Sequence, residues 1–329
     1  MNIGKVPENI LKKNVINRIE KRRSEILIGS GVGEDCAVLD FENHVTVLSD
    51  AVTDPISGNV SLAVIKAVNN IASMGAEPVA ILTSYILPRG FSEKELKAVA
   101  KEIEITCKGL NISVAGGHSE LNESVLKPVI SVTGVGKAEK NKLTCTSNIR
   151  PGDDIVITKW VGLEATVYLA KEHEEILIKK FPQRMIYEAA AYDRYLSIVP
   201  EAAGAVKSGA AAMHDVSTGG IFTALFEMAE AAGVGLTADI KKIPIKQETV
   251  EICNFFDLNP YEIASAGSLL IAAKDGKALV KAFSEEKINA AVIGKFTDSN
   301  DRIIINGDNV RFLEPFRNDE IYKMKEKKL

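Results

Sequence analysis

Near the middle of the chain, the residues Arg150-Pro151-Gly152-Asp153-Asp154 stand directly before an apolar run at 155–158. Proline and glycine together mark a turn, and the apolar run that follows them predicts the first strand of a new unit. The stretch therefore predicts a domain junction, with a first domain at 1–149 and a second at 150–329. Both lengths are ordinary for domains of soluble proteins.

The first half of the chain mixes strand-like and helix-like segments. Residues 1–25 predict an amphipathic helix, because apolar residues recur at helical spacing with basic residues between them. Beyond it, β-branched runs predict strands and helical periodicity predicts helices. The expected order is strand, helix, strand, helix, strand and strand, at residues 45–49, 61–74, 78–87, 92 onward, 112–115 and 129–135.

The second half has the same mixed character. We expect strands at residues 155–158, 268–272 and 291–293, and helices at residues 162–170, 185–199 and 221–232. The charged residues 323–328 predict a frayed tail. Because neither half shows the strict βαβα alternation of a doubly wound sheet, the predicted fold class is α+β.

Composition excludes several classes of protein. The chain is 46% hydrophobic and 26% charged, which argues against disorder and fibrous repeats. Lysine and arginine number 40 against 44 acidic residues, so no basic surface for nucleic acid is expected. No apolar run approaches the roughly 20 residues of a membrane span, and no signal peptide is apparent, so we expect a cytoplasmic protein. The four cysteines include no C-x-x-C pair, which favours buried reduced thiols.

Acidic residues recur where the chain leaves predicted strands or glycine-rich turns. Asp35 follows the loop at 29–33, Asp50 follows the strand at 45–49, and Asp215 precedes a serine, a threonine and the pair Gly219-Gly220. Carboxylates at loop tips suit Mg²⁺, which prefers a few hard oxygen ligands and keeps water or phosphate in its other positions. Two glycines at a helix start offer free backbone N–H groups for an anion. The pattern is consistent with a Mg²⁺–phosphate site.

Ordinary structural roles compete with each of these readings. A single aspartate at a turn is more often a helix cap than a metal ligand, and glycine pairs mostly relieve steric crowding. Neither a Rossmann fingerprint nor a Walker P-loop occurs. His118, between Gly117 and Glu120, fits a hydrogen-bonded structural role as well as a catalytic one.

The order of these segments resembles the aminoimidazole ribonucleotide synthetase-related superfamily, and within it the branch of the hydrogenase-maturation factor HypE. The resemblance extends from about residue 26 to about residue 310. It is carried by residues 33–39 (GEDCAVL), 49–50 (SD), 68–76 (VNNIASMGA), 116–117 (GG), 150–153 (RPGD), 215–220 (DVSTGG) and 221–235.

This resemblance implies a fold and a site. The N-terminal domain would bind ATP and pair its sheet with that of a second subunit into a barrel, beside a C-terminal α+β domain. ATP and Mg²⁺ would activate a small-molecule acceptor in a homodimer, and a maturation protein is an expected partner. The implied catalytic residues are His118 and Asp215, and the implied metal ligands are Asp35, Asp50 and Asp215. The implied nucleotide-side residues are Gly33, Asp35, Asn70, Gly116, Gly117, Gly219 and Gly220.

Three departures from the family pattern keep other functions open. Asn70 and His118 stand where the family usually has acidic residues, although Glu120 is close enough in sequence to substitute. No cysteine follows Cys253, so we do not expect the HypE chemistry on a C-terminal cysteine. The alternatives are a phosphotransferase similar to thiamine-monophosphate kinase and a nucleotide-binding protein without turnover.

Overall fold

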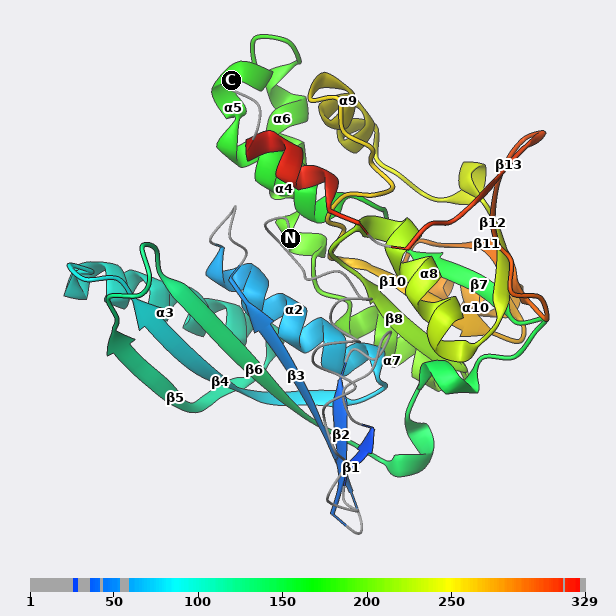
Figure 1. The fold of residues 1–329 in the computed structure, drawn as a ribbon, viewed down its shortest axis with the longest axis horizontal. Coiled ribbons are helices and arrows are strands. Elements are labelled where there is room, and N and C mark those ends of the chain that lie inside the picture. Colours follow the sequence, from blue (N-terminus) through cyan, green and yellow to red (C-terminus); the bar gives the residue numbers. More distant parts are fainter. Residues whose placement is uncertain (1–25, 29–35, 42–43, 54–58, 316, 326–329) are drawn as a thin grey trace. The chain divides into compact units, whose positions relative to one another are not determined.

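The structure is a computed structural model of the 329-residue chain, and it describes residues 26–28, 36–41, 44–53, 59–315 and 317–325 (Figure 1). The described residues belong to two compact units, and the chain passes from one to the other between Leu143 and Thr144. The predicted helix at 1–25, the glycine loop at 29–33 and the predicted ligands Gly33 and Asp35 lie outside the described residues. The predicted domain boundary at 149/150 stays a prediction.

The N-terminal unit is built on an open six-stranded sheet with the order β1-β2-β3-β6-β4-β5. Strands β4 and β5 are parallel, and the other neighbours are antiparallel. Its elements are β1 (Ile26–Ile28), β2 (Ala37–Asp40), β3 (Val45–Val52), α2 (Val60–Ser73), β4 (Glu77–Leu87), α3 (Glu93–Leu110), β5 (Ser113–Leu121), β6 (Val129–Ala138) and the 3-10 turn η2 (Lys140–Lys142).

Helix α2 covers one face of this sheet, and the burial of the side chains along β3 alternates accordingly. Val47 and Ser49 are buried, and the Ser49 hydroxyl donates to the Ala67 carbonyl of α2 at 2.6 Å. Asp50, the next residue, is exposed on the opposite face. Because successive strand residues point to opposite sides, the face away from α2 is left uncovered in this unit.

The C-terminal unit contains a seven-stranded sheet with the order β13-β12-β9-β11-β7-β10-β8. Its strands are β7 (Asp154–Thr158), β8 (Ala212–Val216), β9 (Gly235–Asp239), β10 (Ser268–Ala273), β11 (Ala290–Thr297), β12 (Arg302–Asn306) and β13 (Asn309–Phe312). Its α-helices are α4 (Leu163–Glu172), α5 (Glu174–Leu177), α6 (Gln183–Ala190), α7 (Val199–Lys207), α8 (Gly220–Ala232), α9 (Gln247–Phe255) and α10 (Gly276–Glu285). Its short 3-10 segments are η3 (Thr146–Asn148), η4 (Ala191–Tyr195), η5 (Ile240–Lys242) and η6 (Glu320–Lys325).

Strand β7 is apolar on both sides because helices cover both faces of this sheet. Ile155 and Ile157 pack into the main core with residues of α8, such as Leu225. Gly276, the first residue of α10, lies so close to Val156 that a Cβ on it would come within 3.0 Å of the valine methyl. The predicted turn before β7 is present, because the Arg150 N–H donates to Asp153 at 2.8 Å.

Two predicted segments differ from the structure. The helix expected at 185–199 ends at Ala190, continues as η4, and a separate helix α7 begins at Val199. Pro200 explains the break, because proline lacks the N–H that a helix interior needs but is suited to the first turn. The tail expected to fray from residue 323 belongs, as far as residue 325, to η6, whose Tyr322 and Met324 are buried.

The described part of the chain contains more elements than the sequence patterns indicated. Strands β1, β2, β8, β9, β12 and β13 and helices α5, α9 and α10 were not expected. Most of these segments are short, and several are exposed on one side, so their apolar patterns are brief. None of the described helices combines the length and the apolar character that a bilayer crossing requires.

Candidate active site

Asp50 projects from β3 onto the uncovered face of the N-terminal sheet. Its Oδ1 accepts hydrogen bonds from the hydroxyls of Ser131 and Thr133 on the adjacent strand β6, each at 3.1 Å. These two hydroxyls fix the orientation of the carboxylate, while the side chain itself stays exposed to ligands. Asp50 therefore lies within a strand, near its end, and not at the loop tip that the sequence indicated.

His118 lies on the same uncovered face, three strands away from Asp50. The register aligns Val52 with Ser131, Ser131 with Ser84, and Ser84 with His118 across β3, β6, β4 and β5. With strands ~4.8 Å apart, Asp50 and His118 are separated by about 14 Å across the sheet. The two residues share a face of the N-terminal unit but are too far apart to bind one ion together.

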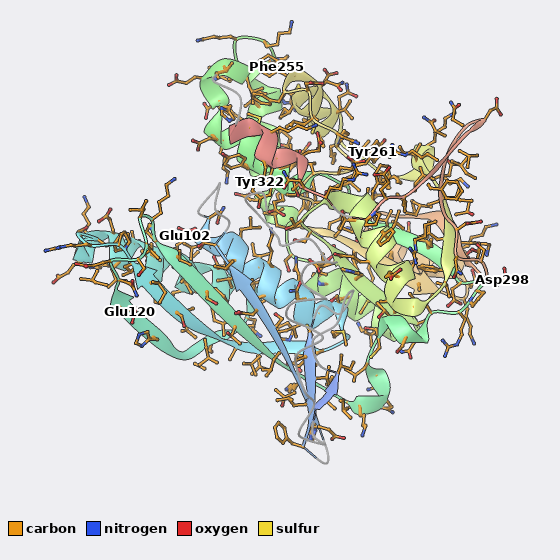
Figure 2. All side chains as sticks on the ribbon, viewed as in Figure 1. Glu102, Glu120, Phe255, Tyr261, Asp298 and Tyr322 are labelled. Carbon is orange, nitrogen blue, oxygen red and sulfur yellow. The ribbon has the colours of Figure 1, made fainter. Side chains whose placement is uncertain are left out.

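A short polar chain extends from His118 along the open face. Its Nε2 lies 3.1 Å from Glu120 Oε2, and the Asn122 amide donates to Glu120 Oε1 at 2.7 Å. Hydrogen bonds from Asn122 and His118 lower the pKa of Glu120, so this carboxyl is ionised at neutral pH. Figure 2 shows Glu120 on β5. This chain can orient the His118 ring, and it supplies a negative charge beside the position where the family pattern has an acid.

Gly116 and Gly117 lie inside β5, which extends well beyond the strand expected at residues 112–115. A Cβ on Gly117 would come within 1.9 Å of the Thr83 carbonyl oxygen, whereas a Cβ on Gly116 would meet nothing closer than Leu82 at 3.7 Å. Gly117 is therefore required for the close approach of β4 and β5. This steric role does not depend on any ligand.

Asn70 lies in α2, beside the start of β2. Its backbone carbonyl accepts a hydrogen bond from the Cys36 thiol at 3.1 Å and another from the Ser73 hydroxyl at 2.8 Å. Cys36 directly follows the predicted ligand Asp35, which is outside the described residues. The contact places the segment that begins at Cys36 against the helix that carries Asn70.

Asp215 lies in the C-terminal unit, near the end of β8, and is 4% exposed. The neighbouring His214 has its Nδ1 at 2.9 Å from the Asp215 carbonyl oxygen and at 3.9 Å from Asp215 Oδ1. Its Nε2 lies 3.3 Å from Glu227 Oε2 on α8. Sequence reasoning missed Glu227, which in the sequence is an ordinary polar position of a helix.

Within residues 36–41, 44–53, 59–315 and 317–325, no group of three or more histidine, cysteine or acidic side chains is arranged to hold a metal.

The pair Gly219-Gly220 forms the predicted helix start. Gly219 is the N-cap of α8 with φ 81°, and a Cβ on Gly220 would come within 2.6 Å of the Tyr261 carbonyl oxygen. The N–H of Gly219 already donates to a carboxylate of the chain itself, Asp319 Oδ2, at 2.6 Å. Sequence reasoning placed an anion at this helix start but did not identify Asp319.

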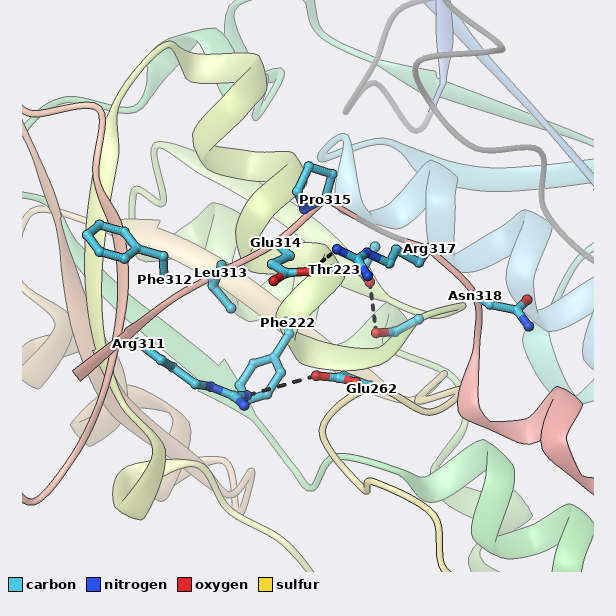
Figure 3. A pocket seen from close by; sticks show the side chains of 11 residues that line it. Phe222, Thr223, Glu262, Arg311, Phe312, Leu313, Glu314, Pro315, Arg317 and Asn318 are labelled. Atoms are coloured by element: carbon cyan, nitrogen blue, oxygen red, sulfur yellow. Dashed lines mark hydrogen bonds and ion pairs between the residues drawn. The ribbon is translucent and has the colours of Figure 1, made fainter. Parts of the chain in front are cut away.

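A pocket of about 390 Å³ opens beside the first turn of α8 (Figure 3). The Arg311 guanidinium lies 4.4 Å above the Phe222 ring, which stacks on Tyr261 with centroids 5.4 Å apart. Each of the two arginines that line the pocket has a carboxylate near it, because Arg311 is 3.9 Å from Glu262 and Arg317 is 2.6 Å from Glu314. The pocket also reaches Gly219, Thr223, Phe312, Leu313, Pro315 and Asn318.

Comparison with known proteins places both units in one family. The family pattern described as AIR synthase related protein, N-terminal domain, matches residues 33–138, and its C-terminal counterpart matches residues 150–306. The chain belongs to the AIR synthase related family. Its α+β units with mixed sheets fit the fold of this family, and the resemblance to the HypE branch is confirmed.

Two relatives illustrate the branch. A protein of Methanocaldococcus jannaschii assigned to hydrogenase expression and formation is 28% identical over 313 residues, which cover 92% of this chain and 91% of the relative. Carbamoyl dehydratase HypE of Cupriavidus necator is 27% identical over 230 residues, which cover 68% of this chain and 62% of that protein.

Solved structures of the family share the fold at low identity. HypE in a HypE–HypF complex has a TM-score of 0.74 at 19% identity, with 93% of this chain and 99% of that chain covered. HypE in complex with ATP has a TM-score of 0.67 at 19% identity, with coverage of 87% and 89%. AaThiL complexed with AMPPCP and TMP has a TM-score of 0.68 at 19% identity, with coverage of 87% and 93%.

Proposed function

We propose that this chain is an ATP- and Mg²⁺-dependent enzyme that activates a small-molecule acceptor in the manner of the HypE branch. The observation that carries the proposal is the carboxylate of Asp50, oriented by Ser131 and Thr133 on an uncovered sheet face. Among the described residues, these hydrogen bonds reach Oδ1 alone, which leaves Oδ2 to face a cation. Solved relatives that bind ATP or AMPPCP support the nucleotide.

The proposed roles follow the two halves of the chain. Residues 1–149 would form the nucleotide-binding, dimerising domain, and residues 150–329 the C-terminal α+β domain. Asp35, Asp50 and Asp215 would hold Mg²⁺, which when bound neutralises phosphate oxygens. His118, oriented by Glu120, and Asp215 would act on the acceptor. The residues proposed to contact the nucleotide are Gly33, Asp35, Asn70, Gly116, Gly117, Gly219 and Gly220.

We propose a separate small molecule as the acceptor instead of Cys253 or Cys107. Cys253 is fully buried, and burial raises the pKa of its thiol to about 12. Burial likewise raises the pKa of Cys107 to about 11. A protonated, buried thiol is a poor nucleophile, because the thiolate is the reactive form.

A homodimer would cover the open face of the N-terminal sheet. Val52, Leu82 and Val129 alternate onto that face and are 52%, 41% and 37% exposed. Apolar side chains gathered on one sheet face favour a protein partner, and a second copy would close the two sheets into the barrel that the family resemblance implies. A cytoplasmic location and a maturation protein as a further partner belong to the same proposal, and the HypE–HypF complex supports the latter.

Calorimetric titration with ATP, with and without Mg²⁺, tests the proposal directly. We expect Mg²⁺-dependent binding by the wild type and a loss of about tenfold in affinity for Asp50→Asn, because the isosteric amide removes the charge that faces the cation. Glu123→Gln is the matched control, since Glu123 is an exposed carboxylate paired only with Arg89 among the described residues. Equal ATP affinity in Asp50→Asn and the wild type would contradict the role of Asp50.

Two alternatives make different predictions for turnover. A phosphotransferase similar to thiamine-monophosphate kinase, favoured by the fold likeness to AaThiL, would convert thiamine monophosphate and ATP to thiamine diphosphate and ADP. A nucleotide-binding protein without turnover would bind ATP but hydrolyse it no faster than a variant with Asn70→Asp and His118→Asp. A wild type that hydrolyses ATP faster than this double variant excludes the second alternative.

A further inference from the structure

The C-terminal segment at residues 317–325 is held on its unit by both polar and apolar contacts. The Glu320 carboxylate accepts from the Asn259 N–H at 3.0 Å, and the Glu320 N–H donates to the Glu262 carbonyl at 3.2 Å. Ile321 and Tyr322 are 5% and 8% exposed, and Figure 2 marks Tyr322 in this segment. A segment held in this way has a defined position, so its side chains have defined partners.

The main polar anchor of the segment is a buried carboxylate at the start of α8. Asp319 is 1% exposed, and its Oδ2 accepts from the Gly219 N–H at 2.6 Å. Its Oδ1 accepts from the N–H groups of Ala264 at 3.2 Å and of Ile321 at 2.9 Å. The carboxylate thus occupies the place, at the positive end of a 13-residue helix, where an external anion would bind.

The pocket beside this anchor gives an anion a way in. It reaches Gly219 itself and is walled by Arg311 from β13 and by Arg317 and Asn318 from the C-terminal segment (Figure 3). Two guanidinium groups, each near a carboxylate of the same pocket (Glu262 and Glu314), therefore lie beside the approach to the N–H that Asp319 occupies. Movement of the segment would carry Arg317, Asn318 and Asp319 away together.

We propose that residues 317–325 form an autoinhibitory latch, in which Asp319 occupies the backbone site that the oxyanion of a ligand, such as a phosphate group, would otherwise take. The proposal rests on the phosphate-side role proposed above for Gly219 and Gly220. Ligand and latch exclude each other at one N–H group, so an oxyanion binds only when Asp319 has left. The apparent affinity for the oxyanion is then reduced by the fraction of molecules in which the latch is closed.

The docked position of the segment places the carboxyl of Asp319 in a buried environment that disfavours its ionised form. Burial raises the pKa of Asp319 to about 6, even though three backbone N–H groups lower it, and the nearby Glu164 carboxyl raises it further. The ionised carboxylate is thus less stable in the docked segment than it would be in water.

Calorimetric titration of the full-length protein with inorganic phosphate at neutral pH, without Mg²⁺, tests the latch. We expect Asp319→Asn to bind phosphate about tenfold more tightly than the wild type, as it would if roughly nine molecules in ten were latched. Glu123→Gln, which removes an exposed carboxylate of the N-terminal unit outside the latch and its pocket, should stay within about twofold of the wild type. Equal or weaker binding by folded Asp319→Asn, or tighter binding by both variants, overturns the proposal.

A measurement on the wild type covers the case in which Asp319→Asn does not fold. Amide hydrogen exchange in residues 317–325 should become faster as phosphate is added, while exchange in α8 beyond its first turn stays unchanged. Unchanged or slower exchange in residues 317–325 overturns the latch. Titration of the same samples with Mg²⁺ and ATP separates the two proposals. ATP binding without a phosphate response would contradict the latch alone. Absence of ATP binding would contradict the proposed function.

Discussion

Lys159 Nζ lies 2.9 Å from Glu201 Oε1, and both side chains are buried, each with an exposed fraction of 7%. The same ammonium donates to the backbone carbonyls of Tyr195 at 2.9 Å and Ser197 at 2.5 Å. It therefore ties the end of β7 to the connection between η4 and α7, where the predicted single helix is broken. Burial lowers the pKa of Lys159, and the Glu201 carboxylate opposes this effect.

Replacement of Lys159 by methionine should destabilise the C-terminal unit by about 3–5 kcal/mol, because it leaves the buried Glu201 carboxylate without its cation. Urea denaturation monitored by circular dichroism measures the change. The double variant Lys159→Met with Glu201→Gln should recover a large part of this loss, since no buried charge then remains unpaired. A double variant no more stable than the single one would show that the two carbonyl contacts, and not the ion pair, matter most.

Gly117→Ala should destabilise the N-terminal unit by about 3 kcal/mol or more, because the new Cβ would overlap the Thr83 carbonyl and separate β4 from β5. Gly116→Ala is the matched control, since the two glycines have similar φ values of 159° and 154° but only Gly117 meets backbone atoms. Thermal unfolding of both variants gives the comparison. Equal losses for the two would assign the effect to backbone conformation instead of the contact with Thr83.

Leu82→Lys should shift the proposed homodimer toward monomer, because it places a charge in the middle of the apolar residues on the open sheet face. Light scattering coupled to size-exclusion chromatography measures the mass over a range of protein concentrations. Ile105→Lys is the control, since Ile105 is 61% exposed on α3, away from that face. An unchanged dimer in Leu82→Lys would place the subunit interface elsewhere.

Asp319 should make stability depend on pH in a defined direction. Its folded pKa of about 6 lies above the ordinary 3.8, so the stabilisation it contributes is fully present below about pH 4 and is lost as the pH rises through about 6. The difference between the two pKa values corresponds to at most about 3 kcal/mol. The free energy of unfolding of the wild type relative to Asp319→Asn should therefore fall between pH 4 and pH 7. A relative stability that rises over this range would contradict the buried position of the carboxyl.

The sequence predicted the local features that depend on neighbouring residues. The turn before β7, the start of α8 at Gly219-Gly220 and the capped start of α3 at Ser92 all follow from short-range chemistry, and the structure has them. The helix break before Pro200 was predictable from the same rules but was overlooked. The α+β class also followed from the order of the segments.

The contacts that complete the candidate site join residues far apart in sequence. Asp50 meets Ser131 and Thr133 more than 80 residues later, and Gly219 meets Asp319 100 residues later. Periodicity and motif spacing contain no information about such pairs, so the carboxylate at the start of α8 could not be expected. The likeness to known family motifs selected the candidate positions, but it did not indicate that Gly117 is constrained by Thr83.

The strand that carries His118 is also the last strand of its sheet, so one row of its backbone N–H and C=O groups faces outward. Such an edge invites uncontrolled association between chains. Two glycines within β5 lower its tendency to template further strands, because glycine is among the weakest strand formers. Gly117, which lets β4 and β5 approach so closely, thereby also makes this edge a weaker template for association between chains.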